Sequence, residues 1–196
     1  MEESQNIFLV GMMGAGKSTV GKLLARRLGM SFFDADHEIE ARTGVKIPVI
    51  FEVEGEAGFR KRECEVVDAL TQGSNVVVAT GGGAVLDAGT RAHLKSRGFT
   101  IYLSSSVQEL WQRTRNDRGR PMLQTQDPYA RLQHLMQLRE PLYTEVAHMV
   151  IETGRPSVGK LVERIIRELA ARPECGKLIS SMPASTSDSA SIDPND

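Results

Sequence analysis

The stretch from Ile7 to Thr19 constrains the fold of this chain more than any other part of its sequence. A short apolar run, Ile7–Val10, leads into the segment Gly-Met-Met-Gly-Ala-Gly-Lys-Ser-Thr, in which two glycines bracket four residues ahead of Lys17 and Ser18. This spacing matches the phosphate-binding P-loop. An apolar run of this length is typical of a strand buried on both faces. The sequence therefore predicts a buried strand, a phosphate-binding turn and a helix that begins near Lys17.

The residue types of this loop have a chemical reason. Gly11, Gly14 and Gly16 allow backbone conformations that point successive N–H groups into one concavity, and the following helix directs the positive end of its dipole there. Lys17 is expected to meet the terminal phosphates of a nucleotide, and Ser18 to ligate Mg²⁺. A glycine-rich turn without a ligand is the alternative, but the strand before the loop and the helix after it favour nucleotide binding.

Composition argues against several other classes of protein. The chain has 196 residues and a net charge of −1, whereas a protein that binds nucleic acid mainly by electrostatics is usually basic. It has no apolar run long enough to span a bilayer and no signal-peptide pattern. Cys64 and Cys175 are far apart, which favours a reduced setting, and the four histidines have no metal-ligand spacing. We expect a cytoplasmic protein with no nucleic-acid or membrane partner, and a monomeric one.

Strand and helix patterns alternate along the rest of the chain. Apolar strand patterns are expected at 7–10, 31–33, 75–79, 100–103 and 149–151. Helical patterns are expected at 17–28, 37–43, 48–71, 87–96, 107–114, 128 to about 138 and 158–169, with Gly55 and Gly58 interrupting the third. Strands that alternate with helices in this way predict an α/β fold with a parallel sheet covered on both faces.

Two segments fall outside this pattern. Residues 115–126 are polar, aperiodic and rich in helix breakers, so we interpret them as a mobile loop within a lid at about 113–126. The arginines of this region would suit RNA binding, but interleaved aromatic residues are missing, and closure over phosphates is the better interpretation. Residues 173–196 are rich in Ser, Pro and Asp, which predicts a disordered tail after a folded domain at 1–172.

Two aspartates are the expected metal and substrate groups. Many P-loop ATPases place a magnesium-binding Asp at the end of a later apolar strand, but here the run 76–79 ends in Thr80 and glycines. Asp34 and Asp36 follow the second predicted strand, at the edge where open α/β sheets bind ligands. On an extended chain their side chains share one face. The alternative is a pair that caps the next helix, and Asp36 could cap it and still bind substrate.

Three further signals are weak when each is taken alone. The charges of residues 55–63 would suit a solvated helix face. The glycines at 81–83 could form a loose turn, although at the end of a strand they also permit a ligand to approach the backbone closely. Around 139–143, a helix could simply end before Pro141.

Together these motifs resemble the shikimate kinase family, and the resemblance runs from Asn6 to about Leu169. It is carried by the P-loop, the Asp34-x-Asp36 pair, Gly-Glu-x-x-Phe-Arg ending at Arg60, the triple glycine, Arg120-Pro121 and Leu-Arg139-x-Pro-Leu-Tyr. The resemblance implies a three-layer α/β/α fold like that of nucleoside monophosphate kinases, with five parallel strands in the order 2-3-1-4-5 and a mobile lid. It also implies transfer of the ATP γ-phosphoryl group to the 3-hydroxyl of shikimate, in the route to chorismate and the aromatic amino acids.

The resemblance further implies roles for individual residues. It assigns ATP binding to Gly14, Ala15, Gly16, Lys17, Ser18, Thr19, Arg113, Arg120 and Pro156. It assigns shikimate binding to Asp36, Arg60, Gly82 and Arg139, catalysis to Lys17, Asp36 and Arg120, and Mg²⁺ binding to Ser18 and Asp34. Pro156, beside Arg155, departs from the family pattern, because relatives often carry a polar side chain at this adenine-contacting position.

The sequence leaves other functions open. The nearest is another small-molecule kinase of the same fold, such as a gluconate kinase or a nucleoside monophosphate kinase. Two arginines and one aspartate suit a hydroxy acid better than a nucleotide acceptor. A nucleotide-dependent switch is disfavoured because the chain has no Asn-Lys-x-Asp signature and carries a lid. A catalytically inactive scaffold is disfavoured by the intact Lys17, Asp36 and Arg120.

Overall fold

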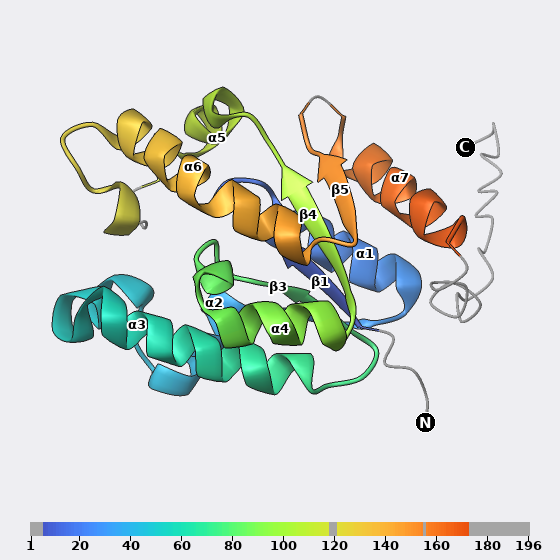
Figure 1. The fold of residues 1–196 in the computed structure, drawn as a ribbon, viewed down its shortest axis with the longest axis horizontal. Helices are drawn as coiled ribbons and strands as arrows, with labels where there is room; N and C mark the ends of the chain where they lie inside the picture. The colour runs from blue at the N-terminus through green and yellow to red at the C-terminus, as the bar shows by residue number, and fades with distance from the viewer. Residues whose placement is uncertain (1–5, 118–120, 155, 173–196) are drawn as a thin grey trace, which may run out of the picture.

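The structure is a computed structural model, and it describes residues 6–117, 121–154 and 156–172. Its centre is one parallel sheet of five strands, drawn as arrows in Figure 1. The strands are β1 (Ile7–Val10), β2 (Ser31–Asp34), β3 (Val76–Ala79), β4 (Phe99–Ser104) and β5 (Met149–Glu152). Their order is β2-β3-β1-β4-β5, which confirms the predicted strand order and the α/β class.

The central strand β1 explains where the site must lie. Ile7 pairs with Val77 of β3 on one side and with Phe99 of β4 on the other. All residues of β1 and β3 are buried, as their continuous apolar sequences predict. Because β2 and β3 lie on one side of β1 and β4 and β5 on the other, the carboxyl end of β1 is the switch point at which open α/β sheets bind ligands.

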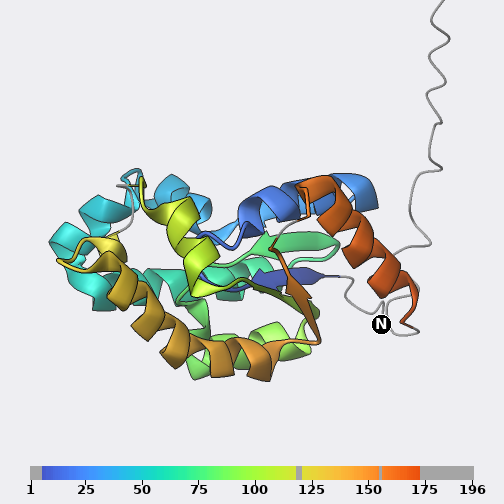
Figure 2. The same cartoon turned by 90° about the horizontal axis from the view of Figure 1, so that it is seen from above.

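Helices cover both faces of the sheet. They are α1 (Lys17–Leu28), α2 (Ala35–Thr43), α3 (Ile47–Thr71), α4 (Ala88–Ser96), α5 (Val107–Thr114), α6 (Pro128–Val146) and α7 (Val158–Ala170), with short 3-10 turns η1 (Ala84–Leu86) and η2 (Pro121–Leu123). Figure 2 shows α1 (blue) and α7 (orange-red) together on one face, and α4 (green) and α6 (gold) on the other. This is the predicted three-layer arrangement.

The helix that carries Arg139 differs from the sequence prediction. It was expected to end at about Leu138, before Pro141, whereas α6 continues through this proline to Val146. A proline inside a helix removes one hydrogen bond and costs about 3 kcal/mol. The buried face of α6 outweighs that cost, because side chains both before and after the proline pack into the core, among them Leu135, Arg139, Tyr143 and Val146.

Three smaller regions can also be compared with the sequence predictions. In α3 only Gly55 leaves the helical conformation, with φ 69° and ψ −176°, whereas Gly58 stays helical. In the predicted lid, α5 ends at Thr114 as predicted, but residues 121–123 form a 3-10 turn that buries Leu123. The mobility of the lid stays a prediction. The tail predicted at 173–196 lies outside the described residues.

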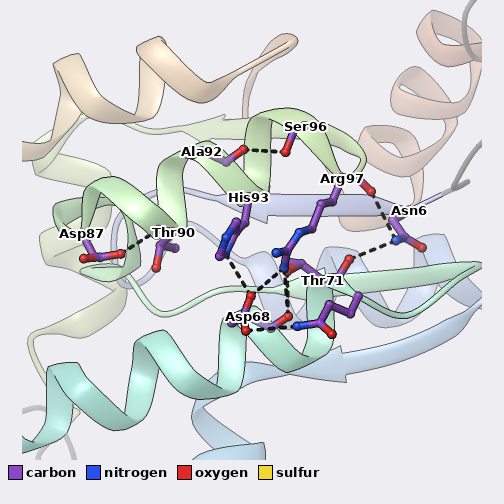
Figure 3. A network of polar contacts seen from close by, with 10 residues as sticks. Asn6, Asp68, Thr71, Asp87, Thr90, Ala92, His93, Ser96 and Arg97 are labelled. Carbon is purple, nitrogen blue, oxygen red and sulfur yellow. Dashed lines mark hydrogen bonds and ion pairs between the residues drawn. The ribbon is translucent and has the colours of Figure 1, made fainter.

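At the amino ends of the strands, opposite the carboxyl ends described above, a polar network joins several elements (Figure 3). Asn6 is 1% exposed; its Nδ2 donates to the carbonyl oxygens of Gly73 (2.7 Å) and Arg97 (3.3 Å), and its Oδ1 accepts from the Val76 N–H (3.2 Å). The Arg97 guanidinium donates to the Asp68 carboxylate at 2.7 Å. These bonds tie the ends of α3 and α4 to the start of β3, so the polar groups at this end of the sheet are used in holding these elements together.

Within the described ranges, no helix is both long and apolar enough to cross a membrane.

Candidate active site

The P-loop follows the carboxyl end of β1 and is shaped by its glycines. Gly11 has φ 141° and Gly16, the N-cap of α1, has φ 91°, which are conformations that other residues rarely adopt. The Lys17 side chain is buried, and its Nζ donates to the carbonyl oxygens of Gly11 (2.8 Å) and Met12 (2.9 Å). Its ammonium group therefore lies over the loop whose N–H groups suit a phosphate.

A cavity of about 370 Å³ opens over this loop. It is lined by Met13, Gly14, Gly16, Lys17, Ser18, Thr19, Asp34, Asp36, Thr80, Gly82 and Arg113. Five of the six P-loop residues predicted to bind ATP line it. The sixth, Ala15, is buried, and its N–H donates to the Met12 carbonyl at 3.1 Å.

Asp34 connects this cavity to α2. Its Oδ2 accepts a hydrogen bond from the Ser18 hydroxyl at 2.5 Å, and its Oδ1 accepts from the N–H groups of Asp36 (3.0 Å) and His37 (3.3 Å). Asp34 is thus the N-cap of α2, which begins at Ala35. The expectation of an extended chain through Asp36 was wrong, because the cap starts the helix immediately after β2. Asp36 lies in its first turn and does not cap it.

A second cavity, of about 270 Å³, adjoins the first. It is lined by Met13, Asp36, His37, Glu40, Ile47, Phe51, Phe59, Arg60, Glu63, Gly81, Gly82, Gly83, Asp117, Pro121, Met122 and Arg139. The structure therefore brings together the four residues predicted to bind shikimate. Met13, Asp36 and Gly82 line both cavities, so Asp36 lies at the junction between them.

The second cavity holds two arginines and a buried carboxylate. Arg60 donates from Nη1 to Glu63 Oε2 (2.5 Å) and from Nη2 to Glu56 Oε1 (3.1 Å). Burial alone would lower the pKa of Arg60, but the two carboxylates raise it above its ordinary value. Burial raises the pKa of Glu63, against the influence of Arg60, and burial lowers the pKa of Arg139, which is 2% exposed. Arginine stays protonated in either case, so the site suits an anionic group.

The triple glycine forms a flat wall against these charges. A Cβ atom on Gly81 would lie 2.1 Å from Glu63 Oε1 and 3.0 Å from Asp36 Oδ1, and one on Gly83 would lie 2.1 Å from Arg60 Nη1. The two contacts at 2.1 Å are too short to exist, so a side chain at either position would displace a charged group of the cavity. The groups that approach these glycines in the structure are side chains of α2 and α3. The close approach of a ligand to their backbone stays a prediction.

Of the remaining predicted ATP residues, Arg113 lines the nucleotide cavity. The Arg113 guanidinium bridges two loops, because it donates to the carbonyl oxygens of Gly14 (3.2 Å) in the P-loop and Gly154 (3.3 Å) after β5. Pro156 is exposed in the bend before α7. Arg120 and Arg155 lie outside the described residues.

Sequence reasoning missed two buried residues of the site. Glu63 was quoted among helix charges without a role, although its position three residues after Arg60 places both on one helix face. Tyr143 was quoted only as the end of a motif, yet its hydroxyl donates to the Gly82 carbonyl at 2.5 Å. Nothing in the sequence indicates that contact, because 61 residues separate the two groups.

Known proteins share this architecture. The family model described as shikimate kinase matches residues 13–170. The shikimate kinase of Burkholderia lata is 59% identical over 164 residues, covering 84% of this chain and 89% of the relative, and that of Thiobacillus denitrificans is 55% identical over 169 residues, covering 86% and 92%. The solved structure of shikimate kinase from Acinetobacter baumannii in complex with shikimate has a TM-score of 0.83 and 49% identity, and the match covers 86% of this chain and 94% of that one.

A gluconokinase from Sinorhizobium meliloti is similar in fold alone, with 18% identity and a TM-score of 0.58. The family model begins within the P-loop, at residue 13, and extends to the end of α7. The family resemblance predicted from the motifs is confirmed: the chain belongs to the shikimate kinase family and is an ATP-dependent phosphotransferase.

Proposed function

We propose that this chain transfers the γ-phosphoryl group of ATP to the 3-hydroxyl of shikimate, giving shikimate 3-phosphate and ADP in the route to chorismate and the aromatic amino acids. One observation carries the proposal. A phosphate-binding cavity and a cavity with two arginines meet at Asp36. A carboxylate with vicinal hydroxyls, held by the arginines at one end, would place a hydroxyl at this junction.

On the nucleotide side, the P-loop would hold the phosphates. The backbone N–H groups and the dipole of α1 would bind their oxygens, and the buried charge of Lys17 would stabilise negative charge as the phosphoryl group moves. Lys17 already lies over the loop, and its hydrogen bonds to the Gly11 and Met12 carbonyl groups would be exchanged for bonds to phosphate.

Mg²⁺ fits the donor set of the same cavity. The Ser18 hydroxyl and the Asp34 carboxylate are adjacent oxygen donors there, which is the chemistry that Mg²⁺ prefers. Among the described residues no cluster of three or more His, Cys, Asp or Glu could hold a metal ion. Mg²⁺ needs none, since it is usually bound by one or two protein oxygens and the substrate phosphates. When bound, the ion would neutralise charge on the β- and γ-phosphates.

On the acceptor side, Arg60 and Arg139 would bind the carboxylate of shikimate and Gly82 would offer its backbone. Asp36 would accept a hydrogen bond from the acceptor hydroxyl and so orient it toward the phosphoryl group. Phosphoryl transfer depends mainly on positioning and charge stabilisation, and this arrangement supplies both. The catalytic role of Arg120, the adenine contact at Pro156, the monomeric state and the cytoplasmic location remain predictions.

The test is ADP release with Mg-ATP and, in parallel, shikimate, gluconate and AMP. Of the three acceptors, only shikimate is expected to give turnover. The Lys17→Ala variant, purified in the same way, serves as the control for contaminating kinases and should show no turnover. Equal or faster turnover with gluconate would overturn the choice of acceptor.

A further inference from the structure

The hydroxyl of Tyr143 is a buried polar group that the reaction scheme above does not use. Tyr143 is fully buried in α6, one helical turn after Arg139, and its ring stacks on that of Tyr102 with centroids 5.1 Å apart. Its hydroxyl donates to the carbonyl oxygen of Gly82 at 2.5 Å. Burial raises the pKa of this hydroxyl well above its ordinary value, so the group stays protonated and remains a donor.

The bond acts on a segment of the site made of glycine alone. Three consecutive glycines have more conformational freedom than any other tripeptide, so Gly81, Gly82 and Gly83 need restraints from outside. Backbone bonds hold the carbonyl oxygens of Gly81 (from Ala84 N–H, 3.2 Å) and Gly83 (from Leu86 N–H, 2.9 Å). The carbonyl of Gly82 is held by Tyr143.

A planar peptide transmits that restraint. Because the Gly82 carbonyl and the Gly83 N–H belong to one trans peptide unit, fixing the oxygen toward α6 fixes the N–H on the opposite side. Gly82 lines both cavities and packs against the P-loop, where a Cβ atom on it would lie 3.3 Å from the Met13 nitrogen. A rotation of this peptide would therefore change the wall shared by the two sites.

We propose that Tyr143 is a positioning residue for the acceptor site, which acts through its hydrogen bond to Gly82 and sets the conformation of the triple glycine for shikimate. The same helix carries Arg139 four residues earlier, on the same face. α6 thus aligns a side chain and a backbone segment of the acceptor cavity together. This inference rests on the proposed function, since it names shikimate as the ligand whose binding is affected.

The test compares Tyr143→Phe with Tyr102→Phe. Both variants keep a buried ring and lose one hydroxyl, but the Tyr102 hydroxyl has Ser104 of β4 as its polar neighbour and makes no hydrogen bond to the triple glycine. For Tyr143→Phe we expect the KM for shikimate to rise about tenfold, as the loss of one buried hydrogen bond allows, with the KM for ATP within about twofold of wild type. Tyr102→Phe should leave both KM values unchanged.

Two further variants separate positioning from packing. Replacing Tyr143 with p-aminophenylalanine keeps the size of tyrosine and restores an N–H donor, whereas p-methylphenylalanine has the size without the donor. We expect the amino variant to recover the shikimate KM and the methyl variant to behave like Tyr143→Phe. Backbone amide exchange at residues 81–83, which needs no turnover, should be faster in the two variants without a donor.

The proposal is overturned if the amino and methyl variants have the same shikimate KM, or if Tyr143→Phe and Tyr102→Phe change both KM values alike. These outcomes differ from those expected if the proposed function is wrong. If it is wrong, the wild-type enzyme itself will not phosphorylate shikimate, and the amide exchange will still report whether Tyr143 restrains the glycines.

Discussion

Asp34 and Ser18 are joined across the nucleotide cavity by a hydrogen bond of 2.5 Å from the serine hydroxyl to Oδ2 of the aspartate. The other oxygen of the same carboxylate caps α2 through the N–H groups of Asp36 and His37. One side chain therefore connects the proposed metal site to the helix that carries Asp36. The capping role and the proposed metal-binding role of Asp34 can be separated experimentally. In Asp34→Asn, the amide keeps an acceptor oxygen for the cap but loses the negative charge.

We expect Asp34→Ala to lower the free energy of unfolding by about 1 kcal/mol, since alanine cannot cap a helix, while Asp34→Asn keeps nearly the wild-type stability. Both variants should need more Mg²⁺ for half-maximal turnover, because both lack the carboxylate. Denaturant unfolding and turnover against Mg²⁺ concentration at fixed ATP measure the two effects. A wild-type Mg²⁺ dependence in Asp34→Asn would leave Asp34 with the capping role alone.

Gly81→Ala should damage the acceptor site without touching the P-loop. The new methyl group would meet the Glu63 and Asp36 carboxylates at 2.1 and 3.0 Å, so both side chains must move. We expect turnover to fall more than about tenfold and stability to fall by about 1–3 kcal/mol, as for other overpacked sites. Steady-state kinetics and thermal melting measure these changes.

Gly159→Ala is the matched control for that variant. Gly159 lies in α7, and no atom comes within 4 Å of a Cβ built on it. Because alanine favours the helix, this variant should be at least as stable as wild type and equally active. Wild-type turnover in Gly81→Ala would show that the carboxylates can relax, and that the glycine is not required by the cavity.

The elements fixed by local chemistry were predictable from sequence. The P-loop, β1 and the start of α1 depend on glycines, a buried apolar run and a helix dipole, all within Ile7–Thr19, and the structure has them as predicted. α5 was also predicted with its observed bounds, and in the structure a capping box of Ser106 and Glu109 fixes its start.

Features that depend on contacts between distant segments were not predictable in the same way. The continuation of α6 beyond Pro141 is decided by burial of side chains against other elements, which local propensity does not contain. The restraint of Gly82 by Tyr143 and the approach of Gly81 to Glu63 join segments far apart in sequence. The positions of Asp36, Arg60, Gly82 and Arg139 around one cavity were expected only through the family resemblance.

Asp36→Asn should weaken shikimate binding far more than ATP binding. The carboxylate lies at the junction of the two cavities, and the amide keeps its size while it removes the charge. A hydrogen bond to a charged group is worth about 1.5–3 kcal/mol, so the Kd for shikimate should rise roughly ten- to hundredfold. Calorimetric titration of each substrate measures this. Unchanged shikimate affinity together with unchanged turnover would remove Asp36 from the acceptor site.

The two arginines of the acceptor cavity should respond differently to replacement by lysine as pH changes. Lysine cannot reproduce the planar, two-pronged contact of arginine with a carboxylate, so both Arg60→Lys and Arg139→Lys should bind shikimate more weakly at pH 7. Their surroundings differ, however. Arg139 is 2% exposed and burial lowers its pKa, whereas Arg60 lies beside Glu63 and Glu56, which raise its pKa.

A lysine at position 139 would have its pKa lowered by the same burial, from an ordinary value of about 10.4. Its charged form exists below that pKa and is lost as pH rises through it, so the shikimate affinity of Arg139→Lys should fall further between pH 7 and pH 9. A lysine at position 60 should stay charged beside its two carboxylates, and Arg60→Lys should show the weak pH dependence of wild type. Calorimetric titration of shikimate at both pH values tests the pair. If Arg139→Lys follows the pH profile of Arg60→Lys, the lysine at position 139 stays charged, and burial does not control the charge at this position.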